Sequence, residues 1–298
     1  MANIGFVGLG HMGLPMAINL MNANHTVTGF DRQPEALTAL QREGGSRAES
    51  LIMLAKDSEI IITMLQTGEQ VKQVCFGEDG LFAAAKKGTL FIDCSSIDVT
   101  SARAFHTQAE EHGHLVLDAP VSGGVLGAKA ATLTFMVGGK EEAFAKAHPI
   151  FLAMGKKIIH TGEAGSGQAA KICNNMILGI SMIAVSEAFV LAEQLELSAQ
   201  KLHEVVTNSS GQCWTMNQYV PVPGILDNVP ANQDYKAGFT AAMMLKDLKL
   251  SQQCAEESGV ETPLGATAKQ LYQSLVNDGM EELDFSAIIK LIHNKAGV

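Results

Sequence analysis

Two side chains that could move a proton lie close together in the segment Gly165 to Asn175. Lys171 and Asn175 are four residues apart, so in a helix they would share one face. A partly buried lysine gives up its proton more readily than a solvated one, which suits acid/base chemistry near neutral pH. Such a lysine can also extend its ammonium group to solvent. We favour the acid/base role because the segment lies where two predicted domains join.

A second chemical signal is the glycine-rich segment Gly8-Leu9-Gly10-His11-Met12-Gly13. An apolar run precedes it, a helical pattern follows it, and the next apolar run ends in Asp31. This layout is typical of a dinucleotide site, in which glycines permit a tight turn and close approach of the pyrophosphate to a helix N-terminus. We expect Asp31 to bind the adenosine ribose and to repel a 2′-phosphate, which favours NAD over NADP. Arg32 could soften that preference, but is more simply a solvated charge.

The segment Asp118 to Gly124 predicts a small-anion site at the end of another apolar run. It reads Asp-Ala-Pro-Val-Ser-Gly-Gly, and glycines let main-chain N–H groups point into a cradle to which a serine hydroxyl adds a donor. A substrate carboxylate would suit a cradle made by Ser122, Gly123 and Gly124. A tight turn without a ligand would need the same glycines, and this alternative stays open.

Three further segments and one aromatic residue hold weaker candidates. Met64-Leu65-Gln66 and Ser96 follow apolar runs, at strand ends where a cofactor would lie. We expect Met64 and Leu65 to contact the nucleotide and Ser96 to bond the nicotinamide ribose, although ordinary loop packing explains these residues equally well. Lys246 could reach the cofactor or the substrate. Trp214, the single tryptophan, could wall a substrate pocket, but burial in the core is the default for this side chain.

Composition argues against a nucleic-acid partner, a disulfide framework and a metal site. The chain has 298 residues, 47% of them hydrophobic, and a formal net charge of -10, whereas nucleic acid requires a basic footprint. Five scattered cysteines without a C-x-x-C pair indicate reduced thiols, not disulfides or zinc. No cluster of His, Asp and Glu suggests a metal. No signal or transit peptide precedes the first strand, and we expect a cytoplasmic protein.

Strand-like and helix-like segments alternate from residue 1 to about residue 160. We predict strands at Ile4–Val7, Thr26–Phe30, Ile60–Met64, Leu90–Asp93, Leu115–Leu117, Leu133–Val137 and Lys157–Thr161. We predict helices at Leu14–Met21, Pro34–Glu43, Glu69–Cys75, Ser101–His112 and Glu141–Met154. This alternation predicts an α/β fold: a Rossmann-type, doubly wound parallel sheet with helices on both faces.

Strand patterns end near Gly167, and the rest of the chain predicts helices only. Gln168–Glu196 reads as one long helix, apolar nearly all round in its middle and therefore buried. Further helices are expected at Ala199–Asn208, Ala241–Glu257, Pro263–Asn277 and Phe285–Ile292. We therefore predict a dinucleotide-binding domain at 1–163 and a helical substrate and oligomerisation domain at 164–298. The most apolar stretch, Met176–Val185, is too short to span a membrane, and surplus apolar surface on the long helix favours a homodimer or homotetramer.

Together these motifs resemble those of the β-hydroxyacid dehydrogenase family over nearly the whole chain. Four segments carry the resemblance: Gly8 to Ala17, Asp118 to Gly124, Gly165 to Asn175, and Lys246-Asp247. They are similar to the family's cofactor, substrate-binding, catalytic and second cofactor-binding signatures, in that order. The resemblance implies that Lys171 is the proton donor and acceptor, that Ser122, Gly123 and Gly124 hold the substrate carboxylate, and that Asn175 orients the substrate.

Within that family the chain is most similar to the branch that acts on 3-hydroxyisobutyrate. The similarity lies in Cys213-Trp214, the segments 219–224 and 229–231, and Tyr235. It implies NAD-dependent oxidation of this 3-hydroxy acid to methylmalonate semialdehyde, a step of valine breakdown. The alternative within the family is an NADPH-using reductase of tartronate or succinic semialdehyde. A dinucleotide-binding module without turnover is a further alternative, against which the presence of Lys171 speaks.

Overall fold

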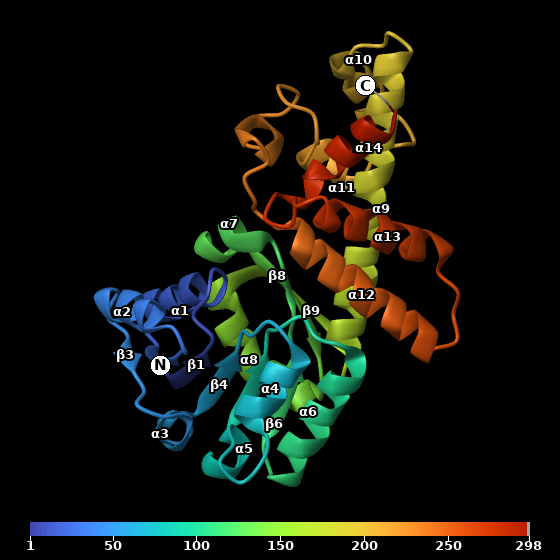
Figure 1. The fold of residues 1–298 in the computed structure, drawn as a ribbon. Helices are drawn as coiled ribbons and strands as arrows, with labels where there is room; N and C mark the ends of the chain where they lie inside the picture. Colours follow the sequence, from blue (N-terminus) through green and yellow to red (C-terminus); the bar gives the residue numbers. More distant parts are fainter. Residues whose placement is uncertain (297–298) are drawn as a thin grey trace. The chain divides into compact units, whose positions relative to one another are not determined.

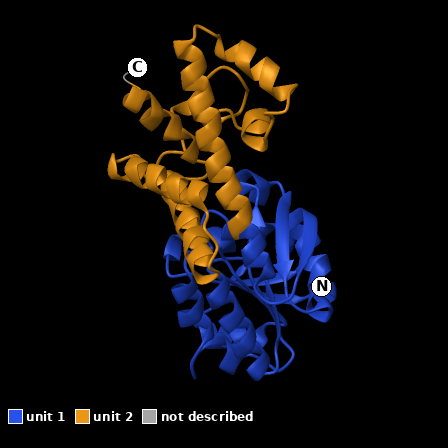
Figure 2. Cartoon of the chain, turned by 90° about the vertical axis from the view of Figure 1, so that its right-hand side faces the viewer, with its two compact units in different colours: residues 1–171 blue, residues 172–298 orange. Residues whose placement is uncertain are grey.

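The chain divides into two compact units in the computed structural model, which describes residues 1–296. Unit 1 comprises residues 1–171 and unit 2 begins at Ile172 (Figure 2). The predicted domain limits, 1–163 and 164–298, would assign all of the long helix to the second domain. In the structure, the first residues of this helix pack within unit 1.

Unit 1 is built on a single sheet. Its strands are β1 (Asn3–Val7), β2 (Thr26–Phe30), β3 (Ser46–Arg47), β4 (Ile60–Thr63), β5 (Leu90–Asp93), β6 (Leu115–Asp118), β7 (Val121–Ser122), β8 (Leu133–Gly138) and β9 (Gly155–Gly162). The order is β3-β2-β1-β4-β5-β6-β8-β7, with β9 paired to β8 (Figure 1). Strands β1 to β6 pair in parallel, as predicted, but β8 runs antiparallel to β6 and β7. The doubly wound fold is thus confirmed, and only its wholly parallel character is wrong.

Helices cover both faces of this sheet (Figure 1). They are α1 (Gly13–Asn22), α2 (Pro34–Arg42), α3 (Leu51–Asp57), α4 (Gly68–Cys75), α5 (Leu81–Ala84), α6 (Val99–Glu111), α7 (Gly124–Lys129) and α8 (Glu141–Met154). Neighbouring strand residues enter opposite cores: Phe6 packs with α1, α2, α7 and α8, whereas Val7 packs with α3 to α6. Burial on both faces explains why the strands read as continuous apolar runs.

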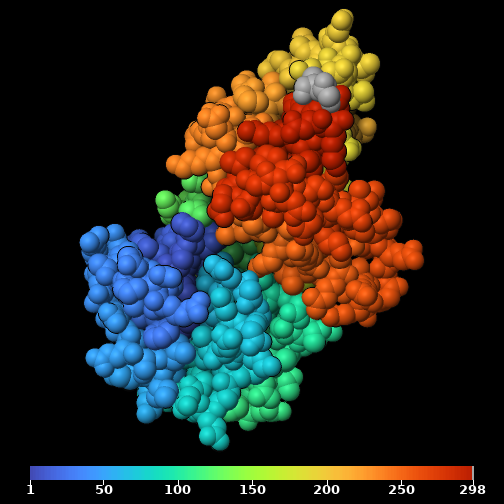
Figure 3. All heavy atoms as spheres, viewed as in Figure 1, coloured from blue at the N-terminus to red at the C-terminus, as the bar shows by residue number. Residues whose placement is uncertain are grey.

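The regular elements of unit 2 are all helices within its described residues, as predicted, and loops with two isolated β-bridges join them. Its elements are α9 (Ser166–Gln194, which starts in unit 1), α10 (Ala199–Thr207), α11 (Trp214–Gln218), η1 (Pro230–Gln233), α12 (Ala241–Glu257), α13 (Pro263–Asn277), η2 (Phe285–Ala287) and α14 (Ile288–Ala296). Two apolar clusters form around α9, one with α12 and α13 and one with the loops near Val220. Helix α10, in yellow, lies at one end of the unit, near the red residues of α14 (Figure 3).

Helix α9 has the expected length, with both ends shifted by two residues, but it is more exposed than expected. It has 29 residues and is the one described helix that is long and apolar enough to cross a membrane, with a mean hydropathy of 1.8 in its most apolar window. The prediction concerned the shorter stretch Met176–Val185, whereas this criterion of length and composition applies to the whole helix. Half of that window is buried inside the protein, and a central core helix meets the same criterion. Ile177 and Leu191 are 62% and 60% exposed, so burial all round is also wrong.

Candidate functional site

The turn between β1 and α1 has the geometry that a dinucleotide requires. Gly8 has a φ of +95°, and a Cβ there would collide with the main-chain oxygen of Met64. A Cβ on Gly13 would collide with the carbonyl oxygen of Gly8, so this glycine lets α1 begin directly against β1. Around Gly10, by contrast, no described atom lies within 4 Å of such a Cβ. The space beside this turn is open to a ligand, and His11, at its tip, is exposed.

Asp31 is fixed next to that turn. Its Oδ2 accepts a hydrogen bond from the N–H of Leu9 at 2.6 Å, and its Oδ1 accepts one from the N–H of Gln33 at 2.8 Å. Each carboxylate oxygen retains a further lone pair for a ligand hydroxyl. The site also lies where strand order reverses, since β1 pairs with β2 on one side and β4 on the other, and open α/β sheets bind ligands at such a point.

The loops after β4 and β5 meet at the same edge of the sheet. The N–H of Leu65 donates to Ser95 Oγ at 2.8 Å, and Ser96, the predicted ribose contact, follows Ser95 and is half-buried. Met64 and Leu65 each pack partly against an apolar core. Ordinary packing therefore accounts for part of both side chains, and their contact with a nucleotide stays a prediction. The N–H of Gln66 donates to the side chain of Gln70 at 3.0 Å.

The structure brings Lys171 to the predicted anion cradle. Its Nζ donates to the main-chain oxygen of Val121 at 2.8 Å, across 50 residues of sequence. Val121 directly precedes Ser122, and the next residues, Gly123 and Gly124, have φ values of +132° and +60°. The glycines thus make the turn that begins α7, and the half-buried lysine lies beside it.

Asn175 and the Lys246-Asp247 pair come together in unit 2. Asn175 is 2% exposed; its Nδ2 donates to Asp247, and its Oδ1 accepts a hydrogen bond from Asn174 at 2.9 Å. Lys246 Nζ lies 4.0 Å from the other oxygen of Asp247. Asp247, which sequence reasoning quoted without giving it a role, therefore orients the Asn175 amide. No spacing rule could have found this pair, because 72 residues separate its members.

Trp214 differs from the expectation of core burial. Its side chain is 53% exposed, and its ring stacks on that of Tyr219 at 5.1 Å between centroids. Tyr219 in turn donates to Asp284, and burial raises the pKa of this phenol well above its usual range. The apolar face of Trp214 is therefore available for contact, and a role as a substrate wall stays a prediction.

Two buried polar residues of unit 1 were missed by sequence reasoning, although both stand inside quoted motifs. Asp118, at the end of β6, and Gln168, in the first turn of α9, are both 0% exposed. Each bonds main-chain groups far away in sequence, which no local pattern reveals. A third, Asp93 at the end of β5, is fully buried, and burial raises its pKa to about 6 in spite of hydrogen bonds from Ser95 and Thr63.

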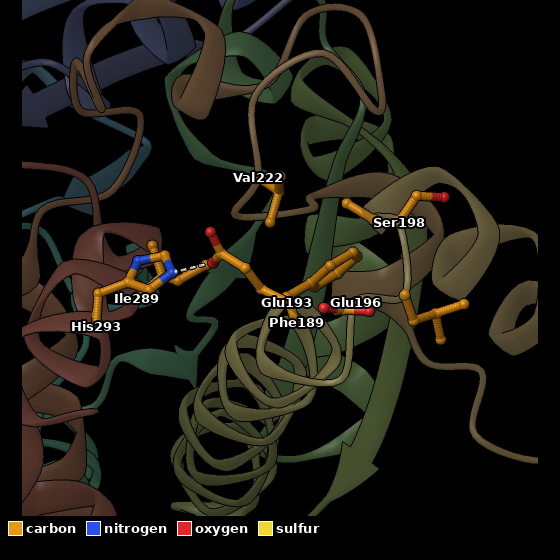
Figure 4. Close-up of a pocket in the computed structure, with 9 residues that line it drawn as sticks. Phe189, Glu193, Glu196, Ser198, Val222, Ile289 and His293 are labelled. Carbon is orange, nitrogen blue, oxygen red and sulfur yellow. Dashed lines mark hydrogen bonds and ion pairs between the residues drawn. The ribbon is translucent and has the colours of Figure 1, made fainter. Parts of the chain in front are cut away.

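A separate hollow in unit 2 contains none of the predicted site residues. It has a volume of about 460 Å³ and lies between the end of α9, the start of α10 and α14, with the ion pair of Glu193 and His293 at 2.9 Å on its wall (Figure 4). Phe189, Val222 and Ile289 give it apolar sides. Among the described residues, no group of three or more His, Cys, Asp or Glu side chains is arranged to hold a metal ion.

Two family models match the chain, one for each part. Residues 3–162 match the NAD-binding domain of 6-phosphogluconate dehydrogenase, and residues 165–292 match the NAD-binding domain of NADP-dependent 3-hydroxyisobutyrate dehydrogenase. With the dinucleotide turn and the doubly wound sheet, these matches define an NAD-dependent hydroxyacid dehydrogenase.

Individual relatives narrow this class. The chain is 48% identical over 296 residues, 99% of either chain, to a Mycobacterium bovis protein named probable 3-hydroxyisobutyrate dehydrogenase. It is 45% identical over 297 residues, 100% of either chain, to the NAD-dependent L-serine dehydrogenase of Pseudomonas aeruginosa. The solved structure of Mycobacterium tuberculosis 3-hydroxyisobutyrate dehydrogenase with L-serine matches with a TM-score of 0.94 at 48% identity, covering 98% of this chain and 99% of that one. The chain belongs to the 3-hydroxyisobutyrate dehydrogenase family.

Proposed function

We propose that this enzyme oxidises 3-hydroxyisobutyrate to methylmalonate semialdehyde, with NAD as oxidant and Lys171 as acid/base. The observation that carries the proposal is the hydrogen bond of 2.8 Å from Lys171 Nζ to Val121, which holds an amine beside Ser122 and Gly123. Oxidation of a hydroxy acid needs a base for the hydroxyl proton and donors for the carboxylate. Relatives named 3-hydroxyisobutyrate dehydrogenase at 44% and 48% identity support the choice of substrate.

The residues of the glycine-rich turn fit NAD. The open side of Gly10 admits a pyrophosphate, α1 offers its N-terminal N–H groups, and the Asp31 carboxylate faces the turn. We assign further contacts to Met64, Leu65, Gln66, Ser96 and Lys246. When bound, NAD accepts the hydride that leaves the substrate carbon.

The chain's own residues carry the proton chemistry. The Ser122 hydroxyl and the N–H groups of Gly123 and Gly124 bind the substrate carboxylate. Neutral Lys171 Nζ accepts the hydroxyl proton while the carbinol C–H bond breaks and the C=O bond forms, and in the reverse direction the ammonium returns that proton. Asn175 donates one N–H to Asp247, and we assign its second N–H to orienting the substrate oxygen.

Loss of Lys171 tests this mechanism. Lys171→Ala should lower kcat by roughly 10²–10⁴ because the transition state loses its base, while NAD binding, measured by fluorescence titration, and the circular dichroism spectrum stay unchanged. Lys171→Arg should lower kcat as well, since a guanidinium does not give up its proton at accessible pH. A Lys171→Ala enzyme with near-normal kcat would contradict the mechanism.

L-serine is a second candidate substrate, because a relative with 45% identity is named for it. It is also a 3-hydroxy acid, with an ammonium group in place of the methyl branch, so the same lysine and anion cradle would serve. Initial rates with both acids and with the reduced forms of tartronate and succinic semialdehyde, each with NAD and NADP, decide the question. A kcat/KM that is highest for 3-hydroxyisobutyrate with NAD supports the proposal; a higher value for L-serine replaces it.

The proposed reaction also suggests a pathway, a cellular compartment and an oligomeric state for the enzyme. An enzyme with this product would act in valine breakdown, and we propose that it does so in the cytoplasm. The exposed apolar side chains of Ile177 and Leu191 on α9 support a homodimer or homotetramer, which sedimentation of the purified enzyme would test.

A further inference from the structure

Gln168 connects α9 to a cofactor loop through both ends of its side chain. Its Oε1 accepts a hydrogen bond from the N–H of Ile97 at 3.1 Å, and its Nε2 donates to the main-chain oxygen of Ser95 at 2.7 Å. The side chain is 0% exposed, so these bonds are shielded from water. Ser96, the proposed contact of the nicotinamide ribose, lies between the two residues that Gln168 holds.

The connection extends to the next loop and to the sheet. Ser95 Oγ accepts from the N–H of Leu65 at 2.8 Å, and the N–H of Ser95 donates to Asp93 at 3.1 Å. The loops that follow β4 and β5 are therefore tied to each other and, through Gln168, to α9. An unbroken series of main-chain and buried side-chain bonds runs from Leu65 to this helix.

The start of α9 is itself fixed against the sheet by Asp118. Its Oδ1 accepts from the N–H of Gly165 at 2.8 Å, and its Oδ2 accepts from the N–H of Gln168 at 2.9 Å. His106 Nε2 lies 2.9 Å from the same Oδ1. A Cβ on Gly167 would collide with the main-chain oxygen of Met136, so the helix backbone lies directly on the strand. The first turn of α9 thus has little freedom to shift.

Lys171 lies three residues after Gln168, in the next turn of α9, and side chains at that spacing neighbour each other on a helix. We propose that Gln168 is a positioning residue, which sets the distance between the Lys171 amine and the cofactor loop at 94–97. The inference rests on the proposed role of Lys171. Gln168 exposes no surface to a ligand, and its proposed action passes through Ser95, Ile97 and the helix.

Gln168→Met tests the inference, because it keeps the side-chain volume and removes both loop bonds. We expect kcat to fall about tenfold or more, since misplacement by about 1 Å can cost up to 10²-fold, while the KM for NAD changes less than about twofold. Hydrogen–deuterium exchange of the free enzyme should become faster in the segment 94–97. Gln194→Met, the same change at the exposed far end of α9, is the matched control. It should change neither kcat nor the exchange rate of the segment 94–97.

An unchanged kcat in a folded Gln168→Met enzyme overturns the inference, even if its melting temperature falls. If that variant does not fold, Ser95→Ala replaces it, because this small change removes the side-chain hydrogen bonds of Ser95 to Leu65 and Asp93 from the same series. A lower kcat with an unchanged KM for NAD then supports the inference, and an unchanged kcat overturns it.

The Lys171 variants distinguish failure of the proposed acid/base role of Lys171 from failure of the positioning role of Gln168. If Lys171→Ala loses turnover and Gln168→Met does not, only the positioning role fails. If Lys171→Ala keeps its turnover, the proposed acid/base fails, and the positioning role fails with it.

Discussion

The Asp31 carboxylate accepts two main-chain hydrogen bonds, and we expect it to bind the adenosine ribose as well. It already accepts N–H groups of Leu9 and Gln33, so the negative charge is held at one place beside the glycine-rich turn. A fixed charge discriminates better between ribose and ribose phosphate than a mobile one, because neither ligand can push it aside. We therefore expect the choice between NAD and NADP to depend mainly on Asp31.

Asp31→Ala should raise the ratio of kcat/KM with NADP to that with NAD by at least about tenfold, because it removes a like charge from the 2′-phosphate. Steady-state rates with both cofactors measure this ratio. Asp31→Asn, which keeps an oxygen for one main-chain N–H, separates loss of charge from loss of the local turn. A wild-type enzyme that prefers NADP would show that the interpretation of Asp31 is wrong.

Ser122 provides the cleanest test of the anion cradle. Gly123 has a φ of +132°, so that a side chain there would strain the backbone and confuse binding with folding. Ser122→Ala changes no backbone preference of this kind. It should raise the KM for the hydroxy acid about tenfold, because a hydrogen bond to a charged group is lost, while the KM for NAD stays constant. An unchanged KM for the hydroxy acid would favour the alternative that Ser122, Gly123 and Gly124 form a tight turn without a ligand.

Long helices and buried strands could be predicted from the sequence, whereas very short elements could not. Buried strands such as Leu90–Asp93 and long helices such as Glu141–Met154 match the predicted bounds, because each carries several apolar residues at one period. The two-residue strands β3 and β7 carry no period at all. The short helix Leu51–Asp57 reads equally well as a strand, and a hydrogen bond from the N–H of Met53 to the Ser50 hydroxyl marks its start.

In the candidate site, too, the sequence predicted the short-range features and missed the long-range ones. Local motifs predicted the glycine-rich turn and the close spacing of Lys171 and Asn175, because turns and helices are short-range structures. The roles of Asp118, Gln168 and Asp247 could not be predicted, since the hydrogen bonds that join them to the start of α9, to Ser95 and to Asn175 span 47 to 73 positions. Buried polar residues take whatever partner the tertiary fold brings to them.

Asp93 affects the stability of the whole chain. Burial raises its pKa to about 6, so between the usual pKa of an aspartate and pH 6 the folded state binds more protons than the unfolded state. The free energy of unfolding should therefore fall as the pH rises through this window, and the loss is complete above it.

Asp93→Asn removes that loss and keeps an oxygen for the Thr63 hydroxyl. The variant should gain up to about 2–3 kcal/mol over the wild type, with the difference growing from pH 4 to pH 6 and constant above it. Urea unfolding at a series of pH values measures the difference. Asp57→Asn, an exposed aspartate at the end of α3, is the control; an equal gain there, or a gain at Asp93 that does not depend on pH, would contradict the argument.

The three glycines of the glycine-rich turn are required for different reasons. Gly8 and Gly13 are required by the protein's own atoms, whereas a Cβ on Gly10 would meet none of them, so that only the expected dinucleotide gives a reason for this glycine. A duplicated gene that was selected for a stable fold alone would keep the first two and be free to lose the third. Gly10 is thus the position at which a descendant of this chain would first reveal that it had stopped using a dinucleotide.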